Sequence, residues 1–172
     1  PVLSLLLDNK TYTDAISASM WVSERNFEWY DTTKYDYAET KQDSIEEKAY
    51  VDSLRNYIGD YTPYEFEVST LDTVYGFPKK IGILANRWSA SMAESFLLTA
   101  MDVKKATIYG ENSGGLISYG DWRPFEIPDL GIWVSITTLN ITNKHNLDLE
   151  KIGITPDFPL SDYPESQWIE HV

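Results

Sequence analysis

The spacing of apolar and polar positions changes near the middle of the chain, and this change predicts a strand followed by a helix. Residues 81–85 (IGILA) form a short apolar run of the kind that makes a buried strand. After Ser91 the apolar positions follow the period of a helix that ends near Asp102. Four of them share one helix face: Ala93, Phe96, Leu97 and Ala100. We therefore expect the strand to lead into the helix through a short polar joint.

The segment after this helix is rich in β-branched and apolar residues. Residues 105–110 (KATIYG) predict another buried strand, and residues 111–115 (ENSGG) predict a glycine-rich turn. Further strands are expected at residues 116–120, 125–128 and 131–142. A strand, a helix, a strand and then several β segments make an α/β arrangement with a β-rich C-terminal end.

The N-terminal third carries shorter patterns. Residues 1–8 have the composition of the end of a helix. The β-branched and aromatic content from Ala15 to about Tyr37 predicts one or two strands with a polar loop. Residues 64–72 (YEFEVSTLD) predict a further strand, and residues 74–80 predict a turn after it.

A capping signature predicts a scaffold helix in this part of the chain. Ser44 followed three residues later by Glu47 forms a capping box, which marks a helix start. Gly59 is a typical helix stop. The apolar stripe between them consists of Tyr50, Leu54, Tyr57 and Ile58.

Aromatic residues make up 14% of the chain and are densest at residues 21–43. Tyrosine and tryptophan combine apolar area with a polar tip, so this segment could contact a sugar or a peptide. Aromatic packing between paired strands explains the same composition, and it is the interpretation we favour.

Length and charge restrict the class of protein. The 172 residues, 42% of them hydrophobic, predict one domain over residues 1–172. The net charge of -13 argues against a nucleic-acid partner, because phosphate binding needs a clustered basic surface. The absence of cysteine excludes disulfides and thiol catalysis. No apolar run approaches the ~20 residues that span a bilayer, and no metal or cofactor motif is present, so we predict no membrane insertion, no metal and no cofactor.

The joint between the 81–85 strand and the helix holds two serines with different expected roles. Ser91 and Glu94 have the spacing of a capping box, and spacing alone favours the cap as the role of Ser91. A helix start also exposes unpaired N–H groups that stabilise a negative oxygen, so a serine there could act as a nucleophile, with the Met92 N–H as oxyanion donor. The two roles are compatible. Ser89 is better explained as a turn serine.

Three motifs occur in a fixed order between Ile81 and Leu160: ILANRWSASMAESF, GENSGG and EKIGITPD. Together they resemble the second half of the catalytic domain of the tail-specific, or C-terminal processing, serine peptidases, including the tricorn-core type. In that family the nucleophile is the serine three residues before a glutamate, which here is Ser91 before Glu94. The resemblance implies the spiral α/β fold shared with Clp protease and crotonase, with a β-rich C-terminal end.

The resemblance also implies roles for other residues. Glu150, in the closing motif, corresponds to the acidic residue that orients a catalytic histidine in the tricorn-like branch. The glycines of the GENSGG turn, Gly114 and Gly115, shape the strand beside the substrate. Trp88, just before the joint, is a candidate substrate-pocket residue, with core packing as the alternative. A bacterial protein in the periplasm or at the cell surface that cuts unstructured peptide tails is expected on the same ground.

The chain departs from the family pattern in three respects. Leu116 stands where members with a Ser-Lys dyad have their lysine, so the dyad mechanism is not expected. The catalytic histidine of the tricorn-like branch lies far upstream of the nucleophile, whereas His145 and His171 both lie downstream of Ser91. The Asp-Leu-Arg-x-Asn-x-Gly-Gly segment of the family is absent as well.

Both missing features lie on the N-terminal side. We therefore expect the chain to be the C-terminal part of a catalytic domain whose N-terminal part lies elsewhere in the parent protein. The alternative is a non-catalytic module that uses the same scaffold to bind peptide, glycan or an apolar ligand.

Overall fold

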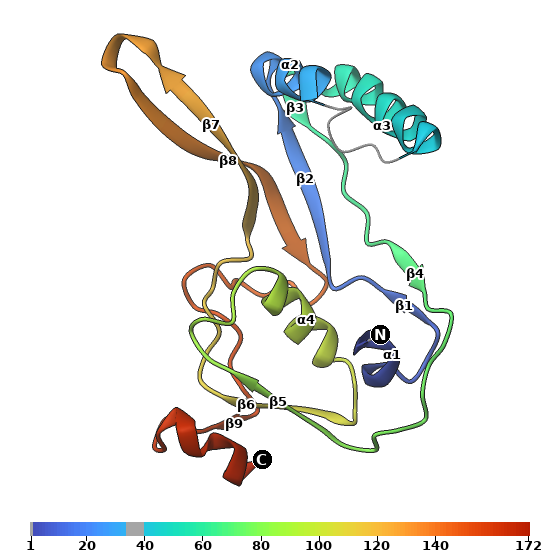
Figure 1. The fold of residues 1–172 in the computed structure, drawn as a ribbon, viewed down its shortest axis with the longest axis vertical. Helices are drawn as coiled ribbons and strands as arrows, with labels where there is room; N and C mark the ends of the chain where they lie inside the picture. Colours follow the sequence, from blue (N-terminus) through green and yellow to red (C-terminus); the bar gives the residue numbers. More distant parts are fainter. Residues whose placement is uncertain (1, 34–39) are drawn as a thin grey trace. The chain divides into compact units, whose positions relative to one another are not determined.

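A computed structural model of the chain describes residues 2–33 and 40–172 (Figure 1). They divide into two compact units. The first unit combines residues 1–17, 65–118 and 141–172, and the second combines residues 18–64 and 119–140. The expectation of a single domain over residues 1–172 is not decided by this division and stays a prediction.

The first unit contains a parallel sheet of the order β5-β6-β9. Strand β5 (Ile81–Ala85) pairs in register with β6 (Ala106–Gly110), and β6 pairs with the short β9 (Phe158–Pro159). Helix α4 (Met92–Ala100) connects β5 to β6. The predicted succession of strand, helix and strand is therefore confirmed, and so is the α/β class.

Helix α4 buries side chains beyond the predicted apolar stripe, whereas strand β5 buries less of its surface than the sequence pattern predicts. Leu97, Leu98 and Ala100 are buried, but Ala93 is exposed. Leu98 lies outside the predicted stripe and is buried with Leu97 in one apolar cluster, while Phe96 and Ala100 pack in a second cluster. Along β5 burial alternates, and Leu84 is 41% exposed. This strand is thus covered on one face, not on both.

Shorter elements complete the first unit. Helix α1 (Val2–Leu6) confirms the predicted helix in residues 1–8. Strand β1 (Thr11–Thr13) pairs antiparallel with β4 (Val68–Thr70), which is the predicted strand of residues 64–72 in a shorter form. The 3₁₀ helix η3 (Glu165–His171) ends the chain and buries Trp168.

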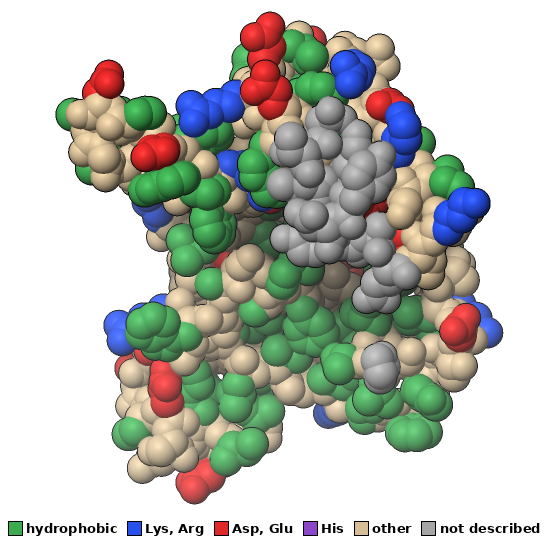
Figure 2. All heavy atoms as spheres, turned by 45° about the horizontal axis from the view of Figure 1, so that its top comes forward, with side chains coloured by type: hydrophobic (Ala, Val, Ile, Leu, Met, Phe, Trp, Pro, Cys, Tyr) green, Lys and Arg blue, Asp and Glu red, His purple; other side chains and the backbone are tan. Residues whose placement is uncertain are grey.

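The second unit is built on a four-stranded sheet of the order β3-β2-β8-β7. Its strands are β3 (Asp60–Tyr61), β7 (Tyr119–Ile127) and the greater part of β2 (Ile16–Val22) and of β8 (Ile132–Asn143). The 3₁₀ helix η2 (Pro128–Leu130) and Gly131 join β7 to β8, so the separate β segments predicted for this region form one long antiparallel hairpin. Hydrophobic side chains lie on the surface of this β7–β8 hairpin (Figure 2), among them Trp122, Leu130 and Trp133, each at least 64% exposed.

Helix α2 (Glu24–Thr33) replaces the strand and loop predicted for this segment. Ser23 explains the difference, because it caps the helix: the Asn26 N–H donates to Ser23 Oγ at 3.1 Å, and the Phe27 N–H donates to the Ser23 carbonyl at 2.9 Å. The β prediction was wrong for residues 24–33 and right for β2. Its last part, from residue 34 to about Tyr37, lies outside the described residues.

Helix α3 (Lys41–Leu54), followed by the 3₁₀ helix η1 (Arg55–Tyr57), confirms the predicted scaffold helix but not its start. The capping box is formed by Thr40 and Asp43, one turn before the predicted pair: Asp43 N–H donates to Thr40 Oγ1 at 3.1 Å and Thr40 N–H to Asp43 Oδ2 at 2.8 Å. Val51 and Leu54 are buried in the core of the second unit, whereas Tyr50 is half exposed.

No helix within the described part of the chain has both the length and the apolarity needed to cross a bilayer.

Candidate active site

The joint between β5 and α4 is a compact turn held by Asn86. The Asn86 side-chain oxygen accepts from the Trp88 N–H at 2.9 Å, and its carbonyl accepts from the Ser89 N–H at 2.8 Å. Ser89 Oγ accepts in turn from the Asn86 N–H at 3.2 Å. The expected role of Ser89 as a turn serine is confirmed.

Ser91 stands directly before α4, exposed, with φ 57° and ψ -119°. A residue with a side chain rarely adopts a positive φ, and such a conformation costs of the order of 1–3 kcal/mol. Strained residues concentrate at active sites, and a serine on a sharp turn between strand and helix is the known arrangement of a nucleophile elbow.

The Met92 N–H is the first backbone donor of α4. The two that follow, on Ala93 and Glu94, donate to the carbonyls of Ala90 at 3.2 Å and Ser91 at 2.8 Å. No acceptor for the Met92 N–H lies within hydrogen-bonding geometry among residues 2–33 and 40–172. A free N–H at the positive end of a helix, next to an exposed hydroxyl, is suited to hold a negative oxygen.

The predicted capping box between Ser91 and Glu94 is present, and its two halves are unequal. The Ser91 N–H donates to Glu94 Oε2 at 3.0 Å. The Ser91 hydroxyl lies on the Glu94 N–H, as the box requires, but this N–H makes its well-formed hydrogen bond to the Ser91 carbonyl at 2.8 Å. The helix cap therefore engages the hydroxyl only weakly.

Glu94 is fully buried, and its carboxylate accepts four hydrogen bonds. Besides the Ser91 N–H, the donors are Ser113 Oγ at 2.6 Å, the Gly115 N–H at 2.7 Å and the Leu116 N–H at 2.9 Å. A buried carboxylate is tolerated only when its acceptor capacity is used in this way. Glu94 therefore fixes the glycine turn against the start of α4, a role that the capping spacing alone did not reveal.

Ser113 extends this network into the closing motif. Its hydroxyl donates to Glu94 and accepts from the Ile154 N–H at 2.7 Å, while its own N–H donates to the Ile154 carbonyl at 3.1 Å. Sequence reasoning treated Ser113 only as a turn residue. The three motifs that carry the family resemblance are thus joined by one buried set of hydrogen bonds.

The glycine turn lies close to the backbone on both of its sides. The Gly114 N–H donates to the Ser89 carbonyl at 3.0 Å. Gly115 has φ 66°, and a Cβ there would lie only 2.7 Å from the Leu149 carbonyl oxygen and 2.8 Å from the Lys151 nitrogen. Only glycine fits such a position. Gly114 and Gly115 are therefore brought to the Ser91 joint as expected, and their contact with substrate stays a prediction.

Glu150 is half-buried on the bend that contacts the glycine turn. The Lys151 N–H donates to the Gly115 carbonyl at 2.9 Å, which ties this bend to the residue bonded to Glu94. No described residue forms a hydrogen bond or ion pair with the Glu150 carboxylate. The carboxylate is available to orient a base, and this role stays a prediction.

Trp88 on the joint and Leu116 after the glycine turn both point to solvent. Trp88 is 77% exposed in this chain, with the Arg87 guanidinium carbon 5.2 Å from the centre of its ring, and its place on a substrate surface stays a prediction. The side chain of Leu116, at the position of the dyad lysine, is 58% exposed.

Neither histidine is placed to activate Ser91. His145 Nε2 lies 3.3 Å from the Leu98 carbonyl and 3.6 Å from Asp102 Oδ1, at the C-terminal end of α4. Leu98 lies seven residues after Ser91, which is about 10 Å along a helix axis. The His171 ring stacks on Tyr163 at the end of the chain. In the described part of the chain, no three His, Cys, Asp or Glu side chains gather to form a metal site.

Comparisons with known proteins bear on the family of the chain. The pattern that defines peptidase family S41 matches residues 14–160, which is most of the chain. Carboxyl-terminal-processing peptidase 2, chloroplastic, from Arabidopsis thaliana is 30% identical over 91 residues, which are 51% of this chain and 16% of that protein.

Solved structures share the fold. Mature CPAF complexed with lactacystin superposes with a TM-score of 0.61 at 18% identity, over 92% of this chain and 35% of that one. A putative peptidase from Parabacteroides merdae gives a TM-score of 0.56 at 16% identity, over 98% of this chain and 41% of that one. The chain therefore spans well under half the length of these relatives. It belongs to peptidase family S41.

Proposed function

We propose that the full-length protein is a serine endopeptidase of the C-terminal processing type and that Ser91 is its nucleophile. The observation that carries the proposal is the strained conformation of Ser91, φ 57° and ψ -119°, directly before a helix whose first N–H, on Met92, is free. This geometry presents the hydroxyl on the outside of the turn and an oxyanion donor beside it.

In the proposed reaction, Ser91 Oγ attacks the carbonyl carbon of the scissile peptide bond and loses its proton to a general base. The carbonyl oxygen becomes an oxyanion, which the Met92 N–H stabilises at the positive end of α4. The base then protonates the leaving amine, and water hydrolyses the ester on Ser91.

The general base in this proposal is a histidine from outside residues 1–172. A serine hydroxyl needs such a base, and both histidines of the chain are engaged away from Ser91. The Glu150 carboxylate, which has no partner among the described residues, orients that histidine and stabilises its charged form.

The proposed substrates are peptides or proteins with unstructured tails, contacted by the exposed Trp88 and by the turn of Gly114 and Gly115. The name of the Arabidopsis relative, a carboxyl-terminal-processing peptidase, supports this substrate class. A location outside the cytosol, at a bacterial cell surface or in a periplasm, belongs to the same proposal.

Covalent labelling of the full-length protein tests the nucleophile. We expect a serine-reactive fluorophosphonate to add one adduct to the wild-type protein, detected by intact mass, and none to Ser91→Ala. Ser89→Ala is the matched control, because Ser89 lies on the same joint and its hydroxyl accepts, among the described residues, a single long hydrogen bond from the Asn86 N–H; this variant should label like the wild type. An adduct that persists in Ser91→Ala would assign the reaction to another residue.

A further inference from the structure

A cavity of about 380 Å³ lies in the first unit along the face of α4 that starts beside Ser91. Met92 and Ser95, one turn apart on this face, form part of its wall. Leu3 and Phe96 supply apolar surface, and Tyr12 and Asp14 come from the segment that leads into β2. A volume of this size is typical of sites that enclose small ligands or side chains.

Among the described residues that line this cavity, Asp14 is the one that carries a charged side chain. Its backbone is held on both sides: the Asp14 N–H donates to the Glu67 carbonyl at 2.9 Å, and the carbonyl of the following residue, Ala15, accepts from the Lys144 N–H at 3.0 Å. Ala15 itself is buried. No described residue forms a hydrogen bond or ion pair with the Asp14 carboxylate.

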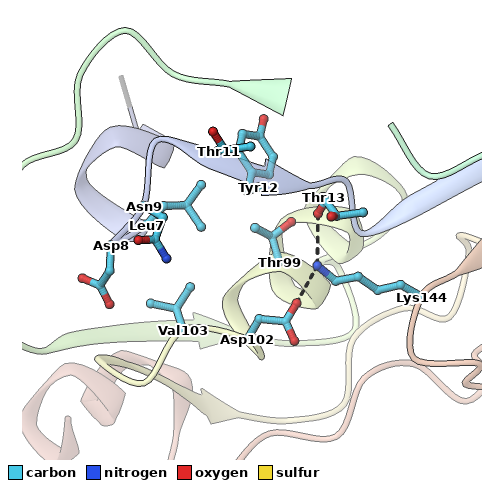
Figure 3. A pocket seen from close by; sticks show the side chains of 10 residues that line it. All are labelled: Leu7, Asp8, Asn9, Thr11, Tyr12, Thr13, Thr99, Asp102, Val103 and Lys144. Carbon is cyan, nitrogen blue, oxygen red and sulfur yellow. Dashed lines mark hydrogen bonds and ion pairs between the residues drawn. The ribbon is translucent and has the colours of Figure 1, made fainter. Parts of the chain in front are cut away.

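A second hollow, of about 250 Å³, shares Tyr12 and Thr99 with this cavity, and its acidic residues differ from Asp14 in being paired. There Lys144 Nζ reaches both Asp102 Oδ2 at 2.5 Å and the Thr13 carbonyl at 3.1 Å (Figure 3). Asp8, also in its wall, lies 3.1 Å from Lys105 Nζ. The acids of the neighbouring hollow are thus paired with lysines of the chain, and Asp14 is not.

We propose that this cavity receives the substrate side chain on the acyl side of the scissile bond and that Asp14 selects lysine or arginine there. The inference rests on the proposed function. The side chain concerned leaves the carbon next to the attacked carbonyl, so it passes close to Met92, whose N–H would hold the oxyanion and whose residue lines the cavity.

The lining matches such a side chain in its two parts. Leu3 and Phe96 cover an aliphatic stem, and the Asp14 carboxylate accepts from the charged tip, in two bonds where the tip is a guanidinium. A neutral side chain of the same shape would displace water and leave the carboxylate unpaired, so the cavity would bind that side chain with lower affinity. An acidic side chain would be repelled.

Two peptides that differ only by arginine or citrulline at this position test the inference, because citrulline keeps the shape and removes the charge. With the full-length wild-type protein we expect kcat/KM at least about 10-fold higher for the arginine peptide. Asp14→Asn should reduce this ratio to near unity while it still cleaves the citrulline peptide. Asp72→Asn, the same change in an exposed loop, should keep the wild-type ratio.

The outcomes separate the cavity from the reaction. Fluorophosphonate labelling of Ser91 together with equal cleavage of both peptides by the wild type would overturn the role of Asp14 and leave the proposed function standing. A preference for arginine that survives in Asp14→Asn would overturn it as well. No labelling and no cleavage by the wild type would overturn the proposed function, and the inference with it.

Discussion

At the scale of single residues, the conformation of Ser91 allows two effects of this residue to be measured separately, one on the free energy of unfolding and one on covalent labelling. Its φ of 57° is one that glycine adopts freely and alanine does not. We therefore expect Ser91→Gly to unfold with a free energy about 1 kcal/mol higher than Ser91→Ala, although both lack the hydroxyl and neither labels. Urea denaturation of the two variants measures this difference. An equal or higher stability of Ser91→Ala would mean that the backbone at this position is unstrained.

Glu94 shows which contacts of a single residue can be predicted from sequence. Its bond to the Ser91 N–H follows from the spacing of a capping box, and the sequence indicated it. The bonds to Ser113, Gly115 and Leu116 join residues 19 to 22 positions apart, and no local period encodes them. The free Met92 N–H was expected because every helix start exposes donors. The strain of Ser91 depends on the whole turn and was not.

At the scale of elements, the turn after β6 needs glycine for two reasons, the positive φ of Gly115 and the close approach of neighbouring backbone. Gly115 and Gly131 have nearly the same positive φ, 66° and 61°, but a Cβ on Gly131 would meet nothing within 4 Å. Gly131→Ala should therefore cost about 1 kcal/mol of unfolding free energy, the penalty of the conformation alone. Gly115→Ala adds a clash with the backbone of residues 149–152 and should cost at least about 2 kcal/mol more.

The same pair of variants tests how the turn supports the nucleophile. Gly115→Ala displaces a donor of the Glu94 carboxylate, so it should also slow fluorophosphonate labelling of Ser91, whereas Gly131→Ala should not. Equal losses of stability in the two variants, measured by urea denaturation, would show that the turn can move away from the bend at residues 149–152.

The elements that sequence predicted well are those in which local and tertiary signals agree. β5, α4 and β6 have a clear period and a common core, and they formed as expected. The segment of α2 has the β-branched and aromatic composition of a strand, but the cap of Ser23 and the burial of Phe27 against Val51 and Leu54 stabilise a helix. The spacing of Ser44 and Glu47 predicted the start of α3 one turn too late, because the capping box that forms is that of Thr40 and Asp43.

At the scale of the whole molecule, each unit has its own core and its own polar network, which is buried in the first unit and partly buried in the second. In the first unit the network is centred on Glu94. In the second it is centred on Asp121, whose carboxylate accepts from Arg123 at 2.6 Å, from Thr138 Oγ1 at 3.1 Å and from the Tyr30 hydroxyl. The Arg123 guanidinium also lies 3.6 Å from the centre of the Trp29 ring.

Because of the Asp121 network, the free energy of unfolding should decrease as the pH rises through the alkaline range. Burial raises the pKa of Tyr30, the bond to Asp121 and its charge raise it further, and Arg123 lowers it by less. The unfolded chain therefore releases the Tyr30 proton from about pH 10 upward, while the folded chain still holds it. The stability that Tyr30 contributes is fully present below that pH and is lost as the pH rises toward the raised pKa of the folded state.

Tyr30→Phe tests this dependence. Below about pH 9 the variant should be less stable by about 1 kcal/mol, because the hydrogen bond to Asp121 is lost. Above about pH 10 its free energy of unfolding should fall less steeply with pH than that of the wild type, so that the two curves converge. Urea denaturation followed by tryptophan fluorescence over this range measures both slopes. Parallel curves above that pH would mean that Tyr30 titrates alike in the folded and unfolded chain, and that the Asp121 network does not hold its proton.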